Sequence, residues 1–507
     1  MEKFSKYLNW SLRILFFIVI IGSVVAFGVI TYFNWGKNNS IISIGFYVSA
    51  IILIFSVYYT LKNKYKKSLI IISIMMIALA LRLLWFYSID SIPVGDFNRM
   101  FICSGEFLKG TTYMFEGTAY FARFPHMSIT VLYFALIRDV FRNSLEAIRF
   151  INIIFSMFNV IILFFISKEI FNDEEKSIWV LFISAIYPPM IIYNNVYCSE
   201  NMAIPLLLLS ILMFLKSFNN NNNRSKNKLL FILASGVSLS ATQIFRPIGY
   251  VIIIAYIMYV FIYFREKIRI KIIMNVLLIV SFAIPLAIVS YTLIGLNITE
   301  NHLWRGTEPP SVSMLKGSNI KSVGRWNQED SEVFDKYNGD YEKVNIAAKE
   351  IIKERLIETP KIDLLKFYTF KYGRQWSIGD FGGAFWAENG LDEAYNKEEY
   401  LNMIGKNEGR MLIRLSVEGG GYIQISYLII LVLSYIGLYK NKKDRNYKID
   451  LLYIIFGGVS LQCLITESQD RYVYPFAWIF IILAMTAFNR SKASLNINMN
   501  GEENERL

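Results

Sequence analysis

Long apolar runs recur along this chain and constrain its fold more than any other feature. A bilayer core about 30 Å thick needs roughly 20 predominantly apolar residues in each helical span. Hydrophobic residues make up 54% of the 507 residues, and charged residues only 18%. The sequence therefore predicts an all-α polytopic membrane protein with about 12–13 spans of bilayer length. The expected spans cover residues 10–33, 41–61, 68–88, 149–167, 177–193, 202–217, 228–244, 247–264, 272–295, 422–440, 449–466 and 472–488.

Basic residues are concentrated in short segments between the apolar runs. The formal net charge is +12, and Lys and Arg crowd into residues 62–67, 216–228, 265–271 and 440–445. Because basic loops stay on the cytoplasmic side of a membrane, we expect a multi-pass cell-membrane protein whose N- and C-termini are both cytoplasmic. Such loops explain the positive charge without a nucleic-acid partner, so none is expected.

Whether the apolar segment 127–141 crosses the membrane decides on which side the remaining loops lie. It is short for a span, and counting it as a full crossing would place two of the basic loops on the outer face. We interpret it as a juxtamembrane or half-inserted helix, although the sequence leaves a full crossing open. The polar segments 89–126, 297–420 and 467–475 then share the external face, and an active site is expected there.

The same pattern divides the chain into five parts. Apolar periodicity stops and charge density rises in the segment after the ninth expected span, which is long enough for a small external domain with its own core. The expected parts are 1–67, an N-terminal pair of spans; 68–295, a catalytic transmembrane module with external loop 89–126; 296–421, an external soluble domain; 422–490, the C-terminal spans; and 491–507, a cytoplasmic tail.

An aspartate in the first external loop is the strongest candidate for catalysis. Asp96 follows Pro93 and Gly95, a few residues beyond the end of an expected span. A base that activates a sugar hydroxyl must be a carboxylate or an imidazole held at hydrogen-bond distance. An aspartate is ionised at neutral pH without special tuning. The alternative is that Asp96 caps the following helix, and Asp90, closer to the end of the span, is the rival base.

Two arginines at expected external span ends are candidates for binding a phosphate. A guanidinium offers paired donors and remains charged, which suits Arg471 to the phosphate of a lipid-linked donor. Arg246, directly before Pro247, is the second candidate. The alternatives are an interfacial arginine among aromatic anchors for Arg471, and snorkelling to a phosphate of the bilayer for Arg246.

Other polar and aromatic residues near these positions are candidates for binding substrate. They lie at external span ends or in segments that mix aromatic and polar groups, as sugar sites do. For each of them an ordinary role at the membrane boundary is the alternative. The candidates are His126, Glu200, Trp376, Glu467, Gln469 and Tyr472.

Cysteine and histidine are too scattered to predict a metal centre. Cys103, Cys198 and Cys463 lack metal-ligand spacing, and His126 and His302 are the only histidines. We therefore expect neither a zinc site nor a disulfide framework, and no cofactor is certain. Carboxylates at the outer face could still hold a divalent cation.

The order of several short motifs resembles the GT-C superfamily of integral-membrane glycosyltransferases. Together the motifs cover most of residues 68–490, and within the superfamily the chain looks most like bacterial enzymes related to protein mannosyltransferases and the aminoarabinose transferase. The motifs are Asp96 after an early span, Phe124-Pro125-His126, Arg149-Phe150-Ile151-Asn152, Ala185-Ile186-Tyr187-Pro188-Pro189, Phe245-Arg246-Pro247 and Glu467-Ser468-Gln469-Asp470-Arg471-Tyr472.

This resemblance implies transfer of a hexosyl or pentosyl group, with inversion, from a polyprenyl-phosphate sugar to a cell-envelope acceptor: a glycan, a lipid or a protein. It implies that Asp96 acts as base or positions the acceptor, and that Arg471 and Arg246 bind the donor phosphate. Asp96 is followed by Phe97, not by an acidic residue, which departs from the protein mannosyltransferase pattern and weakens the assignment to a protein acceptor.

Two other functions fit a chain with many spans and a large external segment. A polysaccharide polymerase or ligase is one alternative, and a flippase for lipid-linked sugars is the other. A flippase would place charged or broken-helix sites near the bilayer midplane. The expected spans carry few charges at that depth, which favours the transferase.

Overall fold

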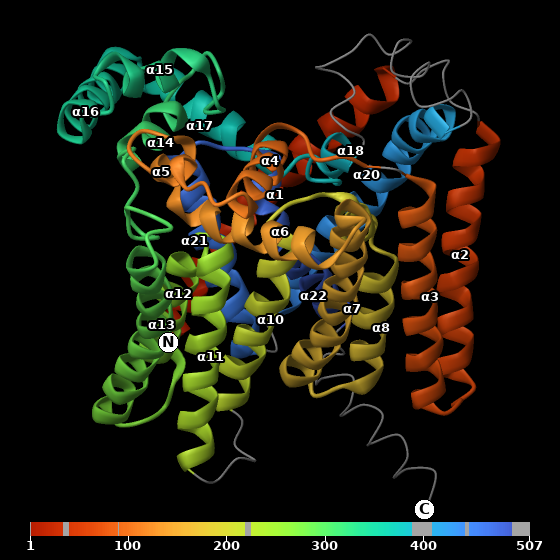
Figure 1. The fold of residues 1–507 in the computed structure, drawn as a ribbon. Coiled ribbons are helices and arrows are strands. Elements are labelled where there is room, and N and C mark those ends of the chain that lie inside the picture. The colour runs from red at the N-terminus through yellow and green to blue at the C-terminus, as the bar shows by residue number, and fades with distance from the viewer. Residues whose placement is uncertain are drawn as a thin grey trace, which may run out of the picture.

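The computed structural model describes residues 2–33, 40–89, 91–218, 225–387, 408–441 and 446–488. The rival base Asp90 and the expected tail 491–507 lie outside these residues. Every regular element of the described part is helical, and the long helices run side by side as a bundle (Figure 1). The expected all-α polytopic membrane fold is confirmed.

Eight helices of the described part are long and apolar enough to cross a membrane. Two bent helix pairs raise the number to ten if each pair is one span, with bends of 56° and 48°. The eight are α1 (Glu2–Phe33), α3 (Lys67–Ser88), α7 (Ser144–Phe171), α10 (Glu200–Ser217), α11 (Ser225–Phe245), α13 (Ile268–Gly295), α20 (Glu408–Asn441) and α21 (Tyr447–Ile465). The bent pairs are α8 (Glu174–Ile186) with α9 (Pro188–Ile192) and η3 (Tyr193–Asn195), and η4 (Asp470–Phe476) with α22 (Trp478–Met485) and η5 (Thr486–Phe488).

The number expected from sequence is higher because it also includes two helices with shorter apolar stretches. These are α2 (Ser40–Lys62), described as an apolar helix from Tyr47, and α12 (Gly249–Tyr263). An α-helix rises 1.5 Å per residue, so the 15 residues of α12 extend about 22 Å, less than the thickness of a bilayer core.

The remaining helices gather at one end of the bundle (Figure 1). The described basic loops 62–67 and 265–271 lie at the opposite end (Figure 1). The gathered helices are α4 (Gly95–Leu108), η1 (Tyr113–Phe115), α5 (Tyr120–Arg123), η2 (Pro125–Met127), α6 (Ser128–Val140), α14 (Pro310–Gly317), α15 (Gln328–Lys336), α16 (Tyr341–Glu358), α17 (Lys361–Gln375) and α18 (Gly383–Ala387).

Helix α6 corresponds to the doubtful apolar segment 127–141. It has 13 residues, which give a length of about 20 Å, too short to cross a bilayer core. Six of its side chains are buried, and it lies with the other short helices (Figure 1). This agrees with the interpretation of the segment as a helix that does not cross.

The bend between α8 and α10 is held by asparagine side chains. The amide of Asn152 donates to the carbonyls of Asn194 and Val196, and the amide of Asn195 donates to the carbonyl of Ile89. Backbone groups without a helical partner must find another partner inside a membrane protein. These hydrogen bonds therefore allow the chain to break here, and they fix the first polar loop beside the start of α10.

The segment between α13 and α17 forms a small domain with a core of its own. Val312, Leu315, Phe334, Val344 and Ala348 are buried together between α14, α15 and α16. Such a core fixes the relative positions of these short helices.

A buried lysine attaches this domain to the bundle. The ammonium of Lys371 in α17 donates to the carbonyls of Gly317, Leu464 and Thr466, at 2.7 Å, 2.8 Å and 2.8 Å. The backbone N–H of Glu467 also donates to the carbonyl of Ser313. The late polar segment is thereby fixed against the small domain.

Candidate active site

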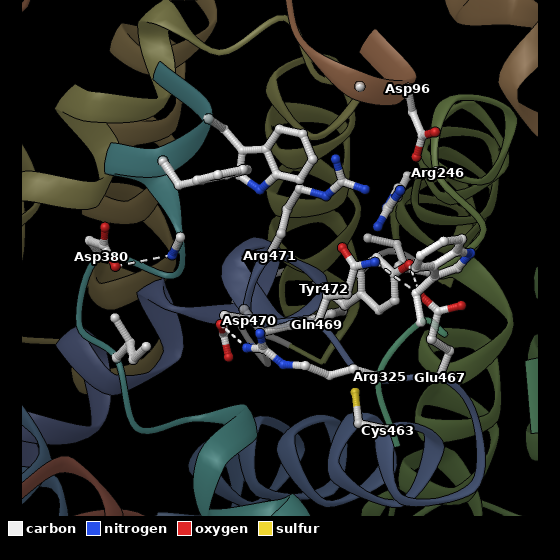
Figure 2. A pocket seen from close by; sticks show the side chains of 18 of the residues that line it. Asp96, Arg246, Arg325, Asp380, Cys463, Glu467, Gln469, Asp470, Arg471 and Tyr472 are labelled. Atoms are coloured by element: carbon white, nitrogen blue, oxygen red, sulfur yellow. Dashed lines mark hydrogen bonds and ion pairs between the residues drawn. The ribbon is translucent and has the colours of Figure 1, made fainter. Parts of the chain in front are cut away.

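A large cavity of about 1960 Å³ lies where the first polar loop, the helix breaks and the small domain meet. Figure 2 shows the Asp96 carboxylate and the guanidinium groups of Arg246 and Arg471 directed toward the same part of it. Seven residues singled out from sequence line this cavity: Asp96, His126, Arg246, Glu467, Gln469, Arg471 and Tyr472.

Asp96 lies in the first turn of α4, where its carboxylate is oriented by a tyrosine. The hydroxyl of Tyr120 donates to Oδ1 of Asp96 at 2.7 Å. Burial, together with the negative charge of Asp96, raises the pKa of Tyr120, so the phenol stays protonated as a donor. The N-cap residue of α4 is Val94, not Asp96. The helix-capping alternative is therefore not what the structure shows for this side chain.

Arg471 is buried in η4 between two aromatic rings. Its side chain is 4% exposed, and its guanidinium carbon lies 4.6 Å from the ring centroids of both Phe97 and Trp386. Nε and Nη1 have no hydrogen-bond partner among the described residues. A buried donor without a partner is costly, so this guanidinium is suited to an anion that enters the cavity. An interfacial arginine that reaches water does not have this geometry.

One buried carboxylate holds both arginines. Glu200 is the first residue of α10 and its side chain is fully buried. Its Oε1 lies 3.3 Å from Nη2 of Arg246 and 3.6 Å from Nε of Arg471. The N-terminus of a helix favours a negative charge, which helps to keep Glu200 ionised. We call Glu200, Arg246 and Arg471 the arginine cluster; it carries two positive charges and one negative charge.

Glu200 does not line the cavity; it forms ion pairs with two arginines that do. Arg246 reaches the cavity because the chain turns between α11 and α12, where the side chain of Gln243 accepts from the backbone N–H of Gly249 at 2.8 Å. The Arg246 guanidinium lies 5.2 Å from the ring centroid of Tyr472. Arg246 is therefore placed by the turn before α12 and Glu200 by the helix break before α10, whereas Arg471 belongs to η4.

Glu467, Gln469 and Tyr472 form a hydrogen-bonded group beside the arginine cluster. Oε1 of Glu467 accepts from Nε2 of Gln469 at 2.9 Å and from the hydroxyl of Tyr472 at 3.1 Å. Its other oxygen lies 3.8 Å from Nζ of Lys316 in α14. The late polar segment thus joins the bundle and the small domain at the cavity wall, as Figure 2 shows for its labelled members.

His126 lies on the cavity wall in its neutral form. Burial and the positive charge of Arg246 lower the pKa of His126 to about 3. At neutral pH the imidazole therefore offers one donor and one acceptor to a substrate.

Trp376 is not placed as expected from sequence. Its side chain is fully buried, with its ring 5.0 Å from that of Phe456 and 5.4 Å from that of Phe480. It packs the core of the bundle and does not line the cavity. The expectation failed because a mixed aromatic and polar segment does not reveal which way each side chain points.

A second tryptophan, which sequence reasoning missed, lines the cavity instead. Trp386 in α18 contacts Arg471 and follows a sharp turn in which Phe381 and Gly382 have positive φ values of 53° and 74°. Asp380 accepts from the backbone N–H groups of Gly382 and Ala384 at 3.0 Å, and so caps the short helix. Burial raises the pKa of Asp380. The Asp380-Phe381-Gly382-Gly383 sequence was the only available signal.

The cavity continues away from the polar groups along an apolar wall. This wall is formed by side chains of α1, α2, α3, α8 and α9 and offers no charge to a ligand. Its members include Ile30, Ala50, Leu53, Leu81, Leu84, Ile186 and Ile191. A ligand with one charged and one apolar end fits such a cavity.

Among the described residues, no three His, Cys, Asp or Glu side chains lie together as a metal site requires. Carboxylates of the cavity are instead engaged with cations or hydroxyl donors, as for Asp96 and Glu467. The described carboxylates of the cavity therefore do not assemble a divalent-cation site.

Comparisons with known proteins find likeness only among solved structures. No family model matches the chain, and no curated protein matches it. The oligosaccharyltransferase AglB from Archaeoglobus fulgidus, solved with an inhibitory peptide and a dolichol-phosphate, is 13% identical with a TM-score of 0.46, over 84% of this chain and 50% of that one. ArnT from Cupriavidus metallidurans, bound to undecaprenyl phosphate, is 11% identical with a TM-score of 0.36, over 82% of this chain and 77% of that one.

These matches are of the kind that the sequence resemblance predicted, since one is an oligosaccharyltransferase and the other the aminoarabinose transferase. This chain spans about half the length of the oligosaccharyltransferase chain. With TM-scores below 0.5, the likeness carries no argument about chemistry, and a shared fold would not by itself imply a shared function. The function is argued from the cavity.

Proposed function

We propose that the protein is a membrane glycosyltransferase that moves a sugar from a polyprenyl-phosphate donor to a cell-envelope acceptor on the external face. The observation that carries the proposal is Arg471, a buried guanidinium in the same cavity as Asp96, whose Nη1 has no hydrogen-bond partner among the described residues. A phosphate would satisfy the N–H groups of Nη1 with charge-assisted hydrogen bonds.

Two features of the cavity, its paired arginines and its apolar wall, support a lipid-linked donor. Its phosphate binds Arg471 and Arg246, where the arginine cluster supplies the excess positive charge. Its polyprenyl chain follows the apolar wall between α2, α3 and α8. A soluble sugar nucleotide would leave this apolar wall without a partner, so the donor class is a lipid-linked one.

The reaction is a direct displacement at the sugar carbon. Asp96 takes the proton of an acceptor hydroxyl as that oxygen bonds to the anomeric carbon, while Tyr120 keeps the carboxylate oriented. The bond from the anomeric carbon to the phosphate oxygen breaks, and its electron pair remains on the phosphate. Arg471 stabilises the charge of this leaving group. The products are an inverted glycosidic bond and free polyprenyl phosphate.

The test is to incubate the purified protein, in lipid, with a panel of polyprenyl-phosphate hexoses and pentoses together with a cell-envelope extract that supplies acceptor hydroxyls, and to measure release of free polyprenyl phosphate. The Asp96→Asn variant should lose about 10²–10⁴-fold in turnover, because a general base contributes that much. Donor binding should persist in this variant. Transfer by Asp96→Asn at the wild-type rate would refute the assignment of the base, and no release from any donor by the wild type would refute the proposed reaction.

A further inference from the structure

The side of the cavity formed by the small domain differs from the arginine cluster in its charge arrangement. We call the cavity-lining residues between Trp304 and Asp335 the outer wall. Cations of this region are already paired: Lys316 lies 3.8 Å from Glu308, and Arg325 bonds to Asp470 of η4.

Arg123 of α5 completes this pairing. It bonds to Glu308 and lies 3.9 Å from Asp335, while Lys316 also approaches Glu467 at 3.8 Å. Three cations thus share four carboxylates, so no positive charge is left for an anionic ligand. Glu332, also on this wall, adds a further negative charge. The outer wall is suited to a ligand that is polar but carries no negative charge.

Two exposed tryptophans stand on this wall. Trp304 is 43% exposed and Trp326 is 57% exposed, although both line the cavity. Trp304 is stacked on His302, with centroids 4.5 Å apart and planes at 6°. His302 is itself fixed by Ser290, whose hydroxyl lies 3.1 Å from Nδ1. Trp304 is therefore a fixed platform with one face covered and the other available.

A carboxylate oxygen at the cavity is also left without a partner. Oδ2 of Asp470 bonds to Arg325, but Oδ1 is buried and has no hydrogen-bond partner within the described part of the chain. A hydroxyl entering from the cavity would satisfy this oxygen. Asp470 and Arg471 both belong to η4, and both line the same cavity.

We infer that the outer wall binds a neutral saccharide, which is the acceptor if the proposed transfer reaction is correct. The rings of the saccharide stack on Trp304 and Trp326, since aromatic faces pack against the apolar faces of sugar rings. Its hydroxyls are recognised by paired carboxylates and by Asp470 rather than by a free cation. An anionic glycan is excluded by the surplus of carboxylates.

The test is binding, measured by saturation-transfer NMR on the protein in lipid nanodiscs loaded with undecaprenyl phosphate. The probes are three neutral trisaccharides, maltotriose, mannotriose and triacetylchitotriose, and the anionic trigalacturonate. At least one neutral trisaccharide should bind the wild type, and trigalacturonate should bind at least tenfold more weakly. Trp304→Ala and Trp326→Ala should each weaken binding about threefold to tenfold, as expected for loss of one aromatic contact.

Trp10→Ala is the matched control, because Trp10 is a 63% exposed tryptophan of α1 that does not line the cavity. It should leave saccharide binding unchanged, and thermal unfolding should confirm that all three variants fold. The inference is overturned if no neutral trisaccharide binds, if trigalacturonate binds equally well, or if the two cavity variants bind like the control. Release of polyprenyl phosphate from a donor supplied with a cell-envelope extract as the source of acceptor hydroxyls tests the proposed function separately, so either idea can fail alone.

Discussion

The arginine cluster and the outer wall line one cavity with similar side chains, yet they are arranged for different ligands. In the cluster, Arg246 and Arg471 share the one carboxylate of Glu200, and Nη1 of Arg471 has no hydrogen-bond partner in the described part of the chain. On the outer wall, cations such as Arg325 already have carboxylate partners. The comparison shows that the presence of an arginine in a cavity does not by itself indicate phosphate binding. What matters is whether carboxylates already occupy its N–H groups.

The largest effect should follow from removing the cluster's central cation. Arg471→Ala should lower kcat/KM for the lipid-linked donor about 10²–10³-fold, as loss of a preorganised donor to developing charge does elsewhere. Arg471→Lys should recover part of this loss, because it restores the charge but not the planar fork. Steady-state kinetics over a range of donor concentrations measure both. If the rate of Arg471→Ala depended on donor concentration as in the wild type, Arg471 would not bind the donor, and the contrast between the two regions would be wrong.

A second large effect is expected on stability. Glu200→Gln removes the carboxylate that pairs with both arginines, and removing one partner of a buried ion pair costs about 3–5 kcal/mol. Thermal unfolding in detergent should show a clearly lowered midpoint for Glu200→Gln. Glu332→Gln, at an exposed carboxylate of the outer wall, is the matched control and should unfold like the wild type. Equal midpoints for the two variants would contradict the counterion role of Glu200.

A smaller effect is expected on the outer wall. The Arg325–Asp470 pair is partly exposed, and such pairs contribute about 0–1 kcal/mol. Arg325→Ala should therefore leave the donor KM unchanged and raise the acceptor KM by no more than about fivefold. Kinetics with donor and acceptor varied in turn separate these constants. A donor KM raised as much as in Arg471→Ala would show that the two regions do not differ.

The smallest effect is expected from His126. Its pKa is lowered to about 3 by burial and by Arg246, so the side chain is neutral above about pH 4. A histidine with a lowered pKa binds its proton only at low pH, so it cannot produce a change in activity near its usual value of about 6.5. Between pH 5 and 8, the pH profile of kcat/KM should have the same midpoints in His126→Gln as in the wild type. A midpoint near 6.5 that disappears in this variant would contradict the neutral assignment.

The sequence predicted the membrane fold because a transmembrane span can be recognised from its length and apolar composition alone. It also selected Asp96, Arg246 and Arg471, because all three are charged residues at or near the expected external ends of spans. The alternation of basic loops placed their segments at one end of the bundle, and the structure gathers these three side chains at one cavity (Figure 2).

What the sequence did not predict depends on the direction of side chains and on packing between distant segments. Trp376 was chosen and is buried, whereas Trp386 was not chosen and contacts Arg471. Glu200 was chosen for substrate, but its carboxylate is engaged behind the cavity with two arginines. Tyr120, the partner of Asp96, lies 24 residues away in the sequence and carries no motif.

The most direct test of the central claim is an experimental structure of the protein with undecaprenyl phosphate bound. The account predicts phosphate oxygens within about 2.7–2.9 Å of the Arg471 guanidinium, in the cavity that Asp96 lines, with the lipid chain along the apolar wall. A phosphate bound at Arg325 of the outer wall, or outside this cavity, would contradict it.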